Sequence, residues 1–341
     1  MTEEKRFRHR KINASALSHG EFLFGALGIF CLLFILRNSE IAIEHMSQGL
    51  TLCAKTVVPS LFPFMVISEL IVSGSLGSNL LRHLTRPFCK LFRLSSDACC
   101  AVLLGMLCGF PIGARCAVSA FQQGRISREE AERVLCFSNN PSSAFMISAV
   151  GGSLWGNPKF GVALYITVLS VSVFTGAVMA RLSKQKEHTK RLEYAFSPST
   201  PTPHGASLFC GAIRASVSSI LLVCAYVVFF SALVGTFNYV PAIQKLPSAL
   251  RALLFCFFEL SGGVSQACAL PSAFASAMLC AFAVGWSGIS VHCQILSVCD
   301  GTQLSLRPYA SAKIIQALLC PLLFAIVLML FPSLLIPAVG I

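Results

Sequence analysis

Charged residues are scarce in this sequence of 341 residues: they make up 12% of the chain, whereas 55% of it is hydrophobic. A water-soluble domain needs a polar surface that so few charges do not provide. Apolar runs of roughly 20 residues, the length that a membrane-spanning helix requires, recur from residue 22 onward. The composition therefore predicts a polytopic membrane protein.

Several catalytic motifs are missing as well, and each absence excludes a class of function. The sequence contains no P-loop and no H-E-x-x-H zinc motif, and it has no nucleophile elbow. We therefore expect neither an enzyme nor an ATP-driven pump within this chain. The 16 cysteines are scattered through apolar segments without a C-x-x-C pair, which is typical of packing residues. We expect no metal site and no cofactor.

The net charge of +12 does not indicate nucleic-acid binding, because of where the positive residues lie. Seventeen of the 26 lysines and arginines fall in three blocks, at 5–11, 82–133 (Arg115 not counted) and 181–191. Basic loops beside membrane spans mark the cytoplasmic side. We expect a multi-pass protein of the inner (cytoplasmic) membrane with a cytoplasmic N-terminus, an uncleaved first span and the lipid bilayer as its partner.

The length of the apolar runs favours helices over the shorter alternating strands of an outer-membrane barrel, so the predicted fold class is all-α. Two amphipathic segments, at 79–94 and 245–258, are expected to be short helices, the first of them on the cytoplasmic membrane surface. The predicted spans are 21–37, 52–76, 127–152, 160–181, 208–236 and 309–331.

One apolar stretch, 96–124, is broken at Gly109–Gly113 and ends in a basic segment that is again cytoplasmic by charge. A segment that leaves and re-enters on the same side is a re-entrant hairpin. Ser127 followed by Glu130 predicts a capping box, so a new helix should begin there. A second broken segment, 260–300, is interrupted at Gly285–Ser290 and is expected to form a second hairpin.

The two broken segments have related sequences. "LFRLSSDA" at 91–98 resembles "FFELSGGV" at 257–264, and "GFPIGARC" at 109–116 resembles "GWSGISVHC" at 285–293. Interrupted helices in matching positions of two inverted repeats point to a substrate site in secondary transporters. The predicted division is a basic N-terminus with the first span (1–45), a first repeat plus a connecting span (46–182), a basic Pro/Ser/Thr linker (183–207) and a second repeat (208–341).

Two acidic residues, Glu69 and Glu259, lie far inside apolar runs, where an ionisable side chain is costly and suggests function. Both are candidates for coupling an ion or proton, and Glu259 is also a candidate ligand for a solute. The alternative is a structural carboxyl that is protonated or paired with Arg115 or Arg214. Arg115 either meets such an acid or an anionic solute, or extends its charged end to the membrane surface.

Irregular backbone at membrane depth survives only where protein or a water-filled cavity surrounds it, so the two expected tips are the candidate binding site. Plain kinks at Gly and Pro, asparagines that only tie helices together and a structural histidine remain the alternatives. The candidate binding residues are Gly109, Pro111, Gly113, Arg115, Asn139, Asn140, Glu259, Ser261, Gly285, Ser287, Ser290, His292 and Gln294.

Three segments, "TVVPSLFPFMVISELI", "GFPIGARCAVSAFQQGRISREEAERVLCFSNNPSSAFMI" and "FELSGG", resemble the YlbJ family of sporulation integral membrane proteins. These proteins belong to the nucleoside-recognition (Gate) domain family, which is distantly similar to concentrative nucleoside transporters. The resemblance covers about residues 45–335. It implies a transporter-like or permease-like protein that binds or passes a small polar solute, such as a nucleoside, between two hairpin tips.

The resemblance also implies roles for individual residues. Gly109, Pro111, Gly113 and Arg115 would form the first tip, Asn139 and Asn140 would lie on the helix after it, Glu259 would be the carboxylate, and Gly285, Ser287 and Ser290 would form the second tip. This first tip carries Phe110, Pro111 and Ile112 where the transporters carry glutamine, threonine and glutamate, so the resemblance does not name the solute. A structural or assembly protein of sporulation membranes, a gate subunit with a partner and a homo-oligomer stay open.

Overall fold

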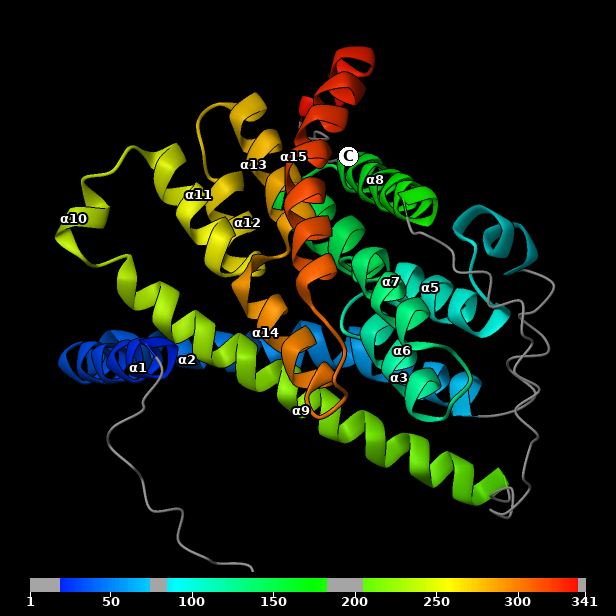
Figure 1. Cartoon of the computed structure of the whole chain (residues 1–341). Helices are drawn as coiled ribbons and strands as arrows, with labels where there is room; N and C mark the ends of the chain where they lie inside the picture. Colours follow the sequence, from blue (N-terminus) through cyan, green and yellow to red (C-terminus); the bar gives the residue numbers. More distant parts are fainter. Residues whose placement is uncertain (1–18, 74–84, 183–204, 337–341) are drawn as a thin grey trace, which may run out of the picture.

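The computed structural model describes residues 19–73, 85–182 and 205–336, in which every regular element is a helix (Figure 1). The predicted all-α class is confirmed. The basic N-terminal segment, most of the linker 183–207 and part of the amphipathic segment 79–94 lie outside the described residues. The predicted four-part division of the chain therefore stays a prediction.

The helices follow in this order, with two π-helices (η2 and η3) and one 3-10 helix (η4) labelled η. They are α1 (His19–Arg37), α2 (Ser39–Leu52), η2 (Cys53–Val57), α3 (Val58–Ser73), α5 (Ser96–Cys108), α6 (Ile112–Gln122), α7 (Arg128–Ser138), η3 (Phe145–Leu154), α8 (Pro158–Leu182), α9 (Gly205–Phe237), α10 (Pro241–Gln244), α11 (Ser248–Phe258), α12 (Leu260–Cys268), α13 (Ala273–Trp286), α14 (Gly288–Cys299), α15 (Arg307–Leu330) and η4 (Pro332–Leu335).

Four candidate spans within the described part of the chain are long and apolar enough to cross a membrane: α8, α9, α15 and the combined helix Ala273–Cys299. Two sharply bent pairs, Gly25–Arg37 with Ser39–Lys55 and Thr85–Phe92 with Ser96–Cys108, raise the number to as many as six. The chain is thus an integral membrane protein with several apolar helices. The spans predicted at 160–181, 208–236 and 309–331 are confirmed as α8, α9 and α15.

The longest helix, α9, runs obliquely along α2 and α3 (Figure 1). With 33 residues it is about 50 Å long, which exceeds the roughly 30 Å of a bilayer's hydrocarbon core and requires a tilt. Small residues let it approach α2 closely: Gly235 lies against the His45 ring, and a Cβ on Gly49 would lie 3.1 Å from the Cα of Val228.

Two predicted helix boundaries are wrong. The span placed at 52–76 begins earlier, because α2, η2 and α3 follow one another from Ser39 and α2 bends away from α1 by 99°. The span placed at 127–152 is broken at Asn139–Ser142, between α7 and η3. Pro141 explains this break, since proline cannot donate a backbone hydrogen bond and keeps the residue before it out of the helical conformation.

The first predicted hairpin has the expected shape. Helix α5 ends at Cys108, its C-cap Gly109 has a φ of 85° that suits glycine, and α6 begins at Ile112. The two helices pack side by side, and a Cβ on Gly105 would lie only 2.7 Å from the Cα of Gly113. The capping box is confirmed at the start of α7: the Ser127 hydroxyl accepts from the Glu130 backbone N–H, and the Glu130 carboxylate accepts from the Ser127 N–H, both at 3.1 Å.

The second reversal of the chain is not where it was predicted. Ser287, between α13 and α14, interrupts the helix, but Ala273–Cys299 continues as one 27-residue candidate span. The chain reverses instead at Glu259, where α11 and α12 pack side by side and a Cβ on Gly263 would lie 2.6 Å from the backbone nitrogen of Cys256. A single left-handed residue at Ser287 breaks the hydrogen-bond ladder without turning the chain back.

The described helices do not show two matching inverted repeats. In the first half, α5 alone lies between the N-cap residue Ser95 and the break at Gly109. In the second half, α12 and α13 both lie between the N-cap residue Glu259 and the break at Ser287. Two buried apolar clusters form the core, and the side chain of Phe110, at the first tip, packs against both of them.

Candidate functional site

A lysine lies at the centre of the molecule, where two helix breaks meet. Lys313 of α15 is fully buried, and its ammonium donates to the Asn139 carbonyl oxygen at 2.5 Å and to the Ser287 hydroxyl at 3.3 Å. No carboxylate of the described residues lies within 4.0 Å of the ammonium. The interior thus holds a positive charge that is hydrogen-bonded but has no ionic partner in the described part of the chain.

The first tip is tied to the end of α7. The backbone N–H of Ala114 donates to the Asn139 side-chain oxygen at 2.9 Å, and the N–H of Phe110 donates to the Asn140 carbonyl at 2.8 Å. The Ser172 hydroxyl donates to the side-chain oxygen of Asn140 at 2.7 Å. Both asparagines are fully buried, so these bonds form without competition from water.

The C-terminal end of α7 stabilises the Lys313 ammonium. Asn139 is the C-cap of α7, and the last carbonyls of a helix carry partial negative charge and lack partners within the helix. The Lys313 ammonium donates a hydrogen bond to one of these carbonyls, that of Asn139. Gln316, nearly one turn further along α15, donates from its side chain to the Cys136 carbonyl at 3.0 Å. Side chains of α15 therefore satisfy two carbonyls at the C-terminal end of α7, and the side chains of Asn139 and Asn140 satisfy two more.

The second break contributes a strained residue. Ser287 has a φ of 76°, a left-handed conformation that is uncommon for a residue other than glycine and that concentrates at functional sites. Gly288 follows with a φ of 78° and touches the second hairpin: a Cβ there would lie 3.0 Å from the Leu260 nitrogen and 3.2 Å from the Glu259 Cα. We call Asn139, Asn140, Ser287, Lys313 and Gln316 the central polar cluster.

Glu259 acts as a helix cap in this structure. Its carboxylate, in a side chain that is only 5% exposed, accepts from the backbone N–H groups of Ser261 at 3.0 Å and Gly262 at 2.6 Å. A negative group at a helix N-terminus is favoured by the partial positive charge there. The predicted site residue Ser261 contributes its backbone N–H to this cap.

Glu69 has the arginine partner that was one of the predicted alternatives. The Arg115 guanidinium lies 3.1 Å from the Glu69 carboxylate and also donates to the Ala215 carbonyl at 2.8 Å. The other candidate, Arg214, is bonded to the Cys210 carbonyl within α9. Arg115 therefore ties α6 to α3 and α9.

The residues after Ser287 lie among buried polar and aromatic side chains. The His292 ring lies 2.8 Å from the Tyr309 hydroxyl and edge-on to Trp286, whose indole N–H donates to the Phe257 carbonyl. Ser290 and Gln294 are buried, and the side-chain oxygen of Gln294 has no hydrogen-bond partner among the described residues.

Two predicted tip residues have plain steric or backbone roles. A Cβ on Gly285 would lie 2.6 Å from the Gln316 carbonyl, so glycine is needed where α13 meets α15. Pro111 lies at the N-cap of α6, within the first tip.

The structure thus brings part of the predicted set together. Lys313 joins Asn139 to Ser287, whereas Asn140 bonds to the first tip and to Ser172. Gly109, Pro111 and Gly113 lie on the hairpin that the two asparagines hold. The sequence prediction missed Lys313 and Gln316. The available signal was a lone lysine inside the apolar run 309–331, to which the rule for ionisable residues within spans applies.

The chemistry of this cluster suits hydrogen bonding and the binding of a polar or negatively charged group. Its one charged side chain is a cation, and its other groups are amides, a hydroxyl and backbone carbonyls. In the part of the chain that the structure describes, no three His, Cys, Asp or Glu side chains are placed to hold a metal ion.

Comparison with known proteins supports the resemblance to sporulation membrane proteins. The chain is 25% identical to the sporulation integral membrane protein YlbJ of Bacillus subtilis (strain 168) in an alignment that covers 86% of this chain and 79% of the relative. No family model matches the chain, and no solved structure matches it.

Proposed function

We propose that this integral membrane protein serves in sporulation and that it binds or passes a small polar solute at the central polar cluster. The name of the similar Bacillus subtilis protein supports the first part. Lys313 supports the second part, because it is fully buried in a candidate membrane span with no carboxylate of the described residues in ion-pair range.

The physical reason is the cost of such a charge. An ammonium group at membrane depth is unfavourable by several kcal/mol unless partners compensate for it, so it persists where function requires it. Asn139 and Ser287 supply two of the three hydrogen bonds that an ammonium can donate. A solute with an oxygen acceptor, such as a ribose hydroxyl, a base carbonyl or a carboxylate, would supply the third.

The position of the lysine suits gating as well as binding. It holds the end of α7 and the break at Ser287, two irregular segments of the kind that line solute sites in membrane transporters. A solute bound at the third N–H of the ammonium would lie beside both of its present bonds. Each bond belongs to a different broken helix, so a solute would change how these helices are held together.

The test is uptake by the purified full-length chain in liposomes, with labelled nucleosides, nucleobases and small carboxylates as the panel. Lys313→Met should reduce uptake of the transported solute at least about tenfold, the effect of roughly 1.4 kcal/mol of lost binding. Lys313→Arg keeps the charge and should retain part of the uptake. Lys245→Met, at an exposed lysine just after α10, is the matched control and should behave as the unmodified chain.

A thermal-shift measurement separates loss of binding from loss of folding. Solute should raise the melting temperature of the unmodified chain and of Lys245→Met, but not that of a folded Lys313→Met protein. Full uptake by Lys313→Met would contradict the proposed site.

One observation favours a second function, that of a non-transporting structural or assembly protein of sporulation membranes or a gate subunit with a partner. The Glu259 carboxylate and both asparagine amides already have bonds within the protein. If no solute of the panel is taken up, and Lys313→Met still supports spore formation in a strain that depends on this protein, the structural function is correct.

A further inference from the structure

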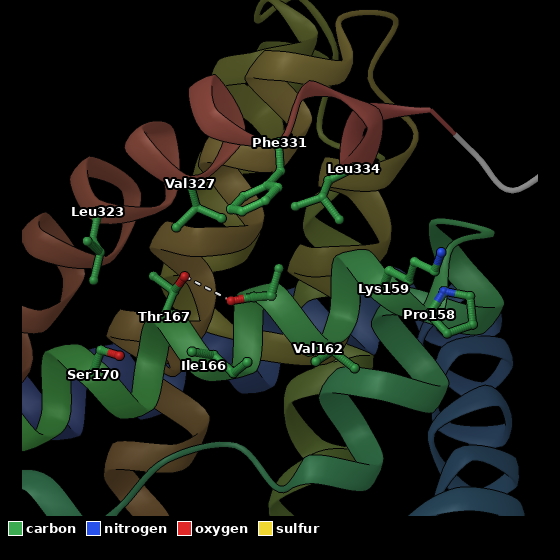
Figure 2. A pocket seen from close by; sticks show the side chains of 11 residues that line it. Pro158, Lys159, Val162, Ile166, Thr167, Ser170, Leu323, Val327, Phe331 and Leu334 are labelled. Carbon is green, nitrogen blue, oxygen red and sulfur yellow. Dashed lines mark hydrogen bonds between the residues drawn. The ribbon is translucent and has the colours of Figure 1, made fainter.

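A groove of about 540 Å³ lies between α8 and the end of α15, away from the central polar cluster (Figure 2). Its walls are mainly apolar. The hydroxyl of the lining residue Thr167 donates to the Ala163 carbonyl of its own helix at 2.9 Å, so its proton is not free to bond a ligand. The lining residues are Pro158, Lys159, Val162, Ala163, Ile166, Thr167, Ser170, Leu323, Val327, Phe331 and Leu334.

The groove lies between two candidate membrane spans and is open at the surface of the chain. Both α8 and α15 are candidate spans, and the lining residues Ile166 and Phe331 are more than half exposed in the isolated chain. An apolar hollow between two spans opens on the hydrocarbon of the bilayer rather than on water. A molecule that fills it therefore comes from the bilayer.

Side-chain bonds hold the groove's end in place. The Trp155 indole N–H donates to the Leu334 carbonyl at 3.1 Å, and the Asn157 amide donates to the Ile336 carbonyl at 3.0 Å. These two bonds fix η4 against the start of α8. The hollow under Phe331 and Leu334 is therefore a built feature of the fold rather than a chance gap between two helices.

Lys159 gives this end a positive charge. It lies in the first turn of α8, where the span begins, its side chain is exposed, and its ammonium has no ion pair with any described residue (Figure 2). The partial positive charge of the helix N-terminus adds to it. An apolar hollow with a lysine at its end, where a span begins, matches a lipid with a negative head group.

We propose that this groove binds one acyl chain of an anionic phospholipid, with the lipid phosphate at Lys159. The apolar walls hold the chain, and the lysine at the membrane surface selects lipids with a net negative head group over zwitterionic ones. A zwitterionic lipid, a second copy of this protein and residues 337–341 are the other possible occupants, and each gives a different result below.

Native mass spectrometry of the full-length chain in detergent tests the proposal, with phosphatidylglycerol and phosphatidylcholine of identical acyl chains as probes. We expect one tightly bound phosphatidylglycerol per chain. Lys159→Glu should weaken its binding about fivefold and leave phosphatidylcholine unchanged. Arg181→Glu, at the opposite end of α8 and also exposed, is the matched control and should have no effect on this lipid.

A second pair of variants tests the hollow itself. Ser170→Trp fills the groove and should reduce binding of both lipids, whereas Phe174→Trp, on an exposed part of the same helix outside the groove, should not. Because Ser170→Trp points into existing space, the variant should keep the melting temperature of the unmodified chain.

Four results would overturn the proposal. Equal binding of the two lipids, unaffected by Lys159→Glu, would show that head-group charge plays no part. Full lipid retention by Ser170→Trp would show that lipid binds elsewhere on the surface. A dimer that Ser170→Trp dissociates would identify a second copy as the occupant, and stronger lipid binding after deletion of residues 337–341 would identify that segment.

Discussion

The two helical hairpins, α5–α6 and α11–α12, reverse the chain in similar ways but hold their tips by different means. Backbone N–H groups of the first tip donate to oxygens of Asn139 and Asn140, which follow about 30 residues later at the end of α7. The second tip is capped by the carboxylate of Glu259, its own first residue. The first tip therefore depends on tertiary packing, whereas the cap of the second is local.

This difference indicates which hairpin is coupled to the central polar cluster. Lys313 bonds to the Asn139 carbonyl, and the Asn139 side chain bonds to the first tip, so a change at Lys313 reaches α6 through one residue. The second hairpin meets the cluster only by packing, where Gly288 lies against Leu260. If a solute moves either hairpin, we expect it to move α5–α6.

Adding a side chain where the two helices of a hairpin touch should cause the largest loss of stability. The loss should be similar in the two hairpins. A Cβ on Gly105 would lie 2.7 Å from the Gly113 Cα, and one on Gly263 would lie 2.6 Å from the Cys256 nitrogen. Backbone atoms cannot move aside cheaply, so Gly105→Ala and Gly263→Ala should each lower the free energy of unfolding by about 3 kcal/mol or more. Denaturation by SDS in mixed micelles measures this.

Gly211→Ala is the matched control for these two variants. Gly211 lies within α9 and has no atom near the position of a new Cβ, so alanine there should raise stability by up to about 1 kcal/mol through helix propensity. A hairpin whose glycine accepts alanine without loss does not have the tight crossing described above.

Removing the side chain that anchors each tip should destabilise the protein more at the first hairpin than at the second. Asn139→Ala leaves the buried N–H of Ala114 without an acceptor and should cost about 2–3 kcal/mol. Glu259→Ala removes an N-cap and should cost about 1 kcal/mol, of which Glu259→Gln should restore part because it keeps one acceptor oxygen. The free energy of unfolding distinguishes the two.

Hydrogen exchange of individual backbone amides measures the same difference between the two tips. The amide of Ala114, which loses its acceptor, should exchange faster in Asn139→Ala and at the normal rate in Glu259→Ala. Asn238→Ala is the control, since the side-chain oxygen of Asn238 has no partner among the described residues. Equal losses of stability in Asn139→Ala and Glu259→Ala would contradict the difference between the tips.

Local signals explain what the sequence could predict. The Ser127–Glu130 capping box, the break at Gly109–Gly113 and the long apolar runs of α8, α9 and α15 depend on short patterns, and the structure confirms them. The second reversal could not be predicted in this way. A glutamate inside an apolar run is equally consistent with a ligand, an ion pair or an N-cap, and the sequence does not give the positions of the Ser261 and Gly262 N–H groups that make Glu259 an N-cap.

Lys313 shows a different limit. It lies six residues after the start of α15, where a lysine often extends its ammonium to the membrane surface. Its burial follows from the packing of α15 against the end of α7, which lies 174 residues earlier in the sequence. No pattern within either helix contains that information, so the charge at the centre of the site required the fold.

The ion pair between Arg115 and Glu69 should give the smallest effect, and it sharpens the comparison because it anchors only the first hairpin. Both side chains are partly exposed, at 16% and 17%, so a double-mutant cycle of Arg115→Gln and Glu69→Gln should give a coupling energy of about 1 kcal/mol or less. Added salt should lower that coupling. Arg115→Gln alone should cost more than Glu69→Gln alone, since Arg115 also bonds the Ala215 carbonyl. If the coupling is zero, the ion pair contributes nothing to the first hairpin, and the contrast between the hairpins rests on their tips.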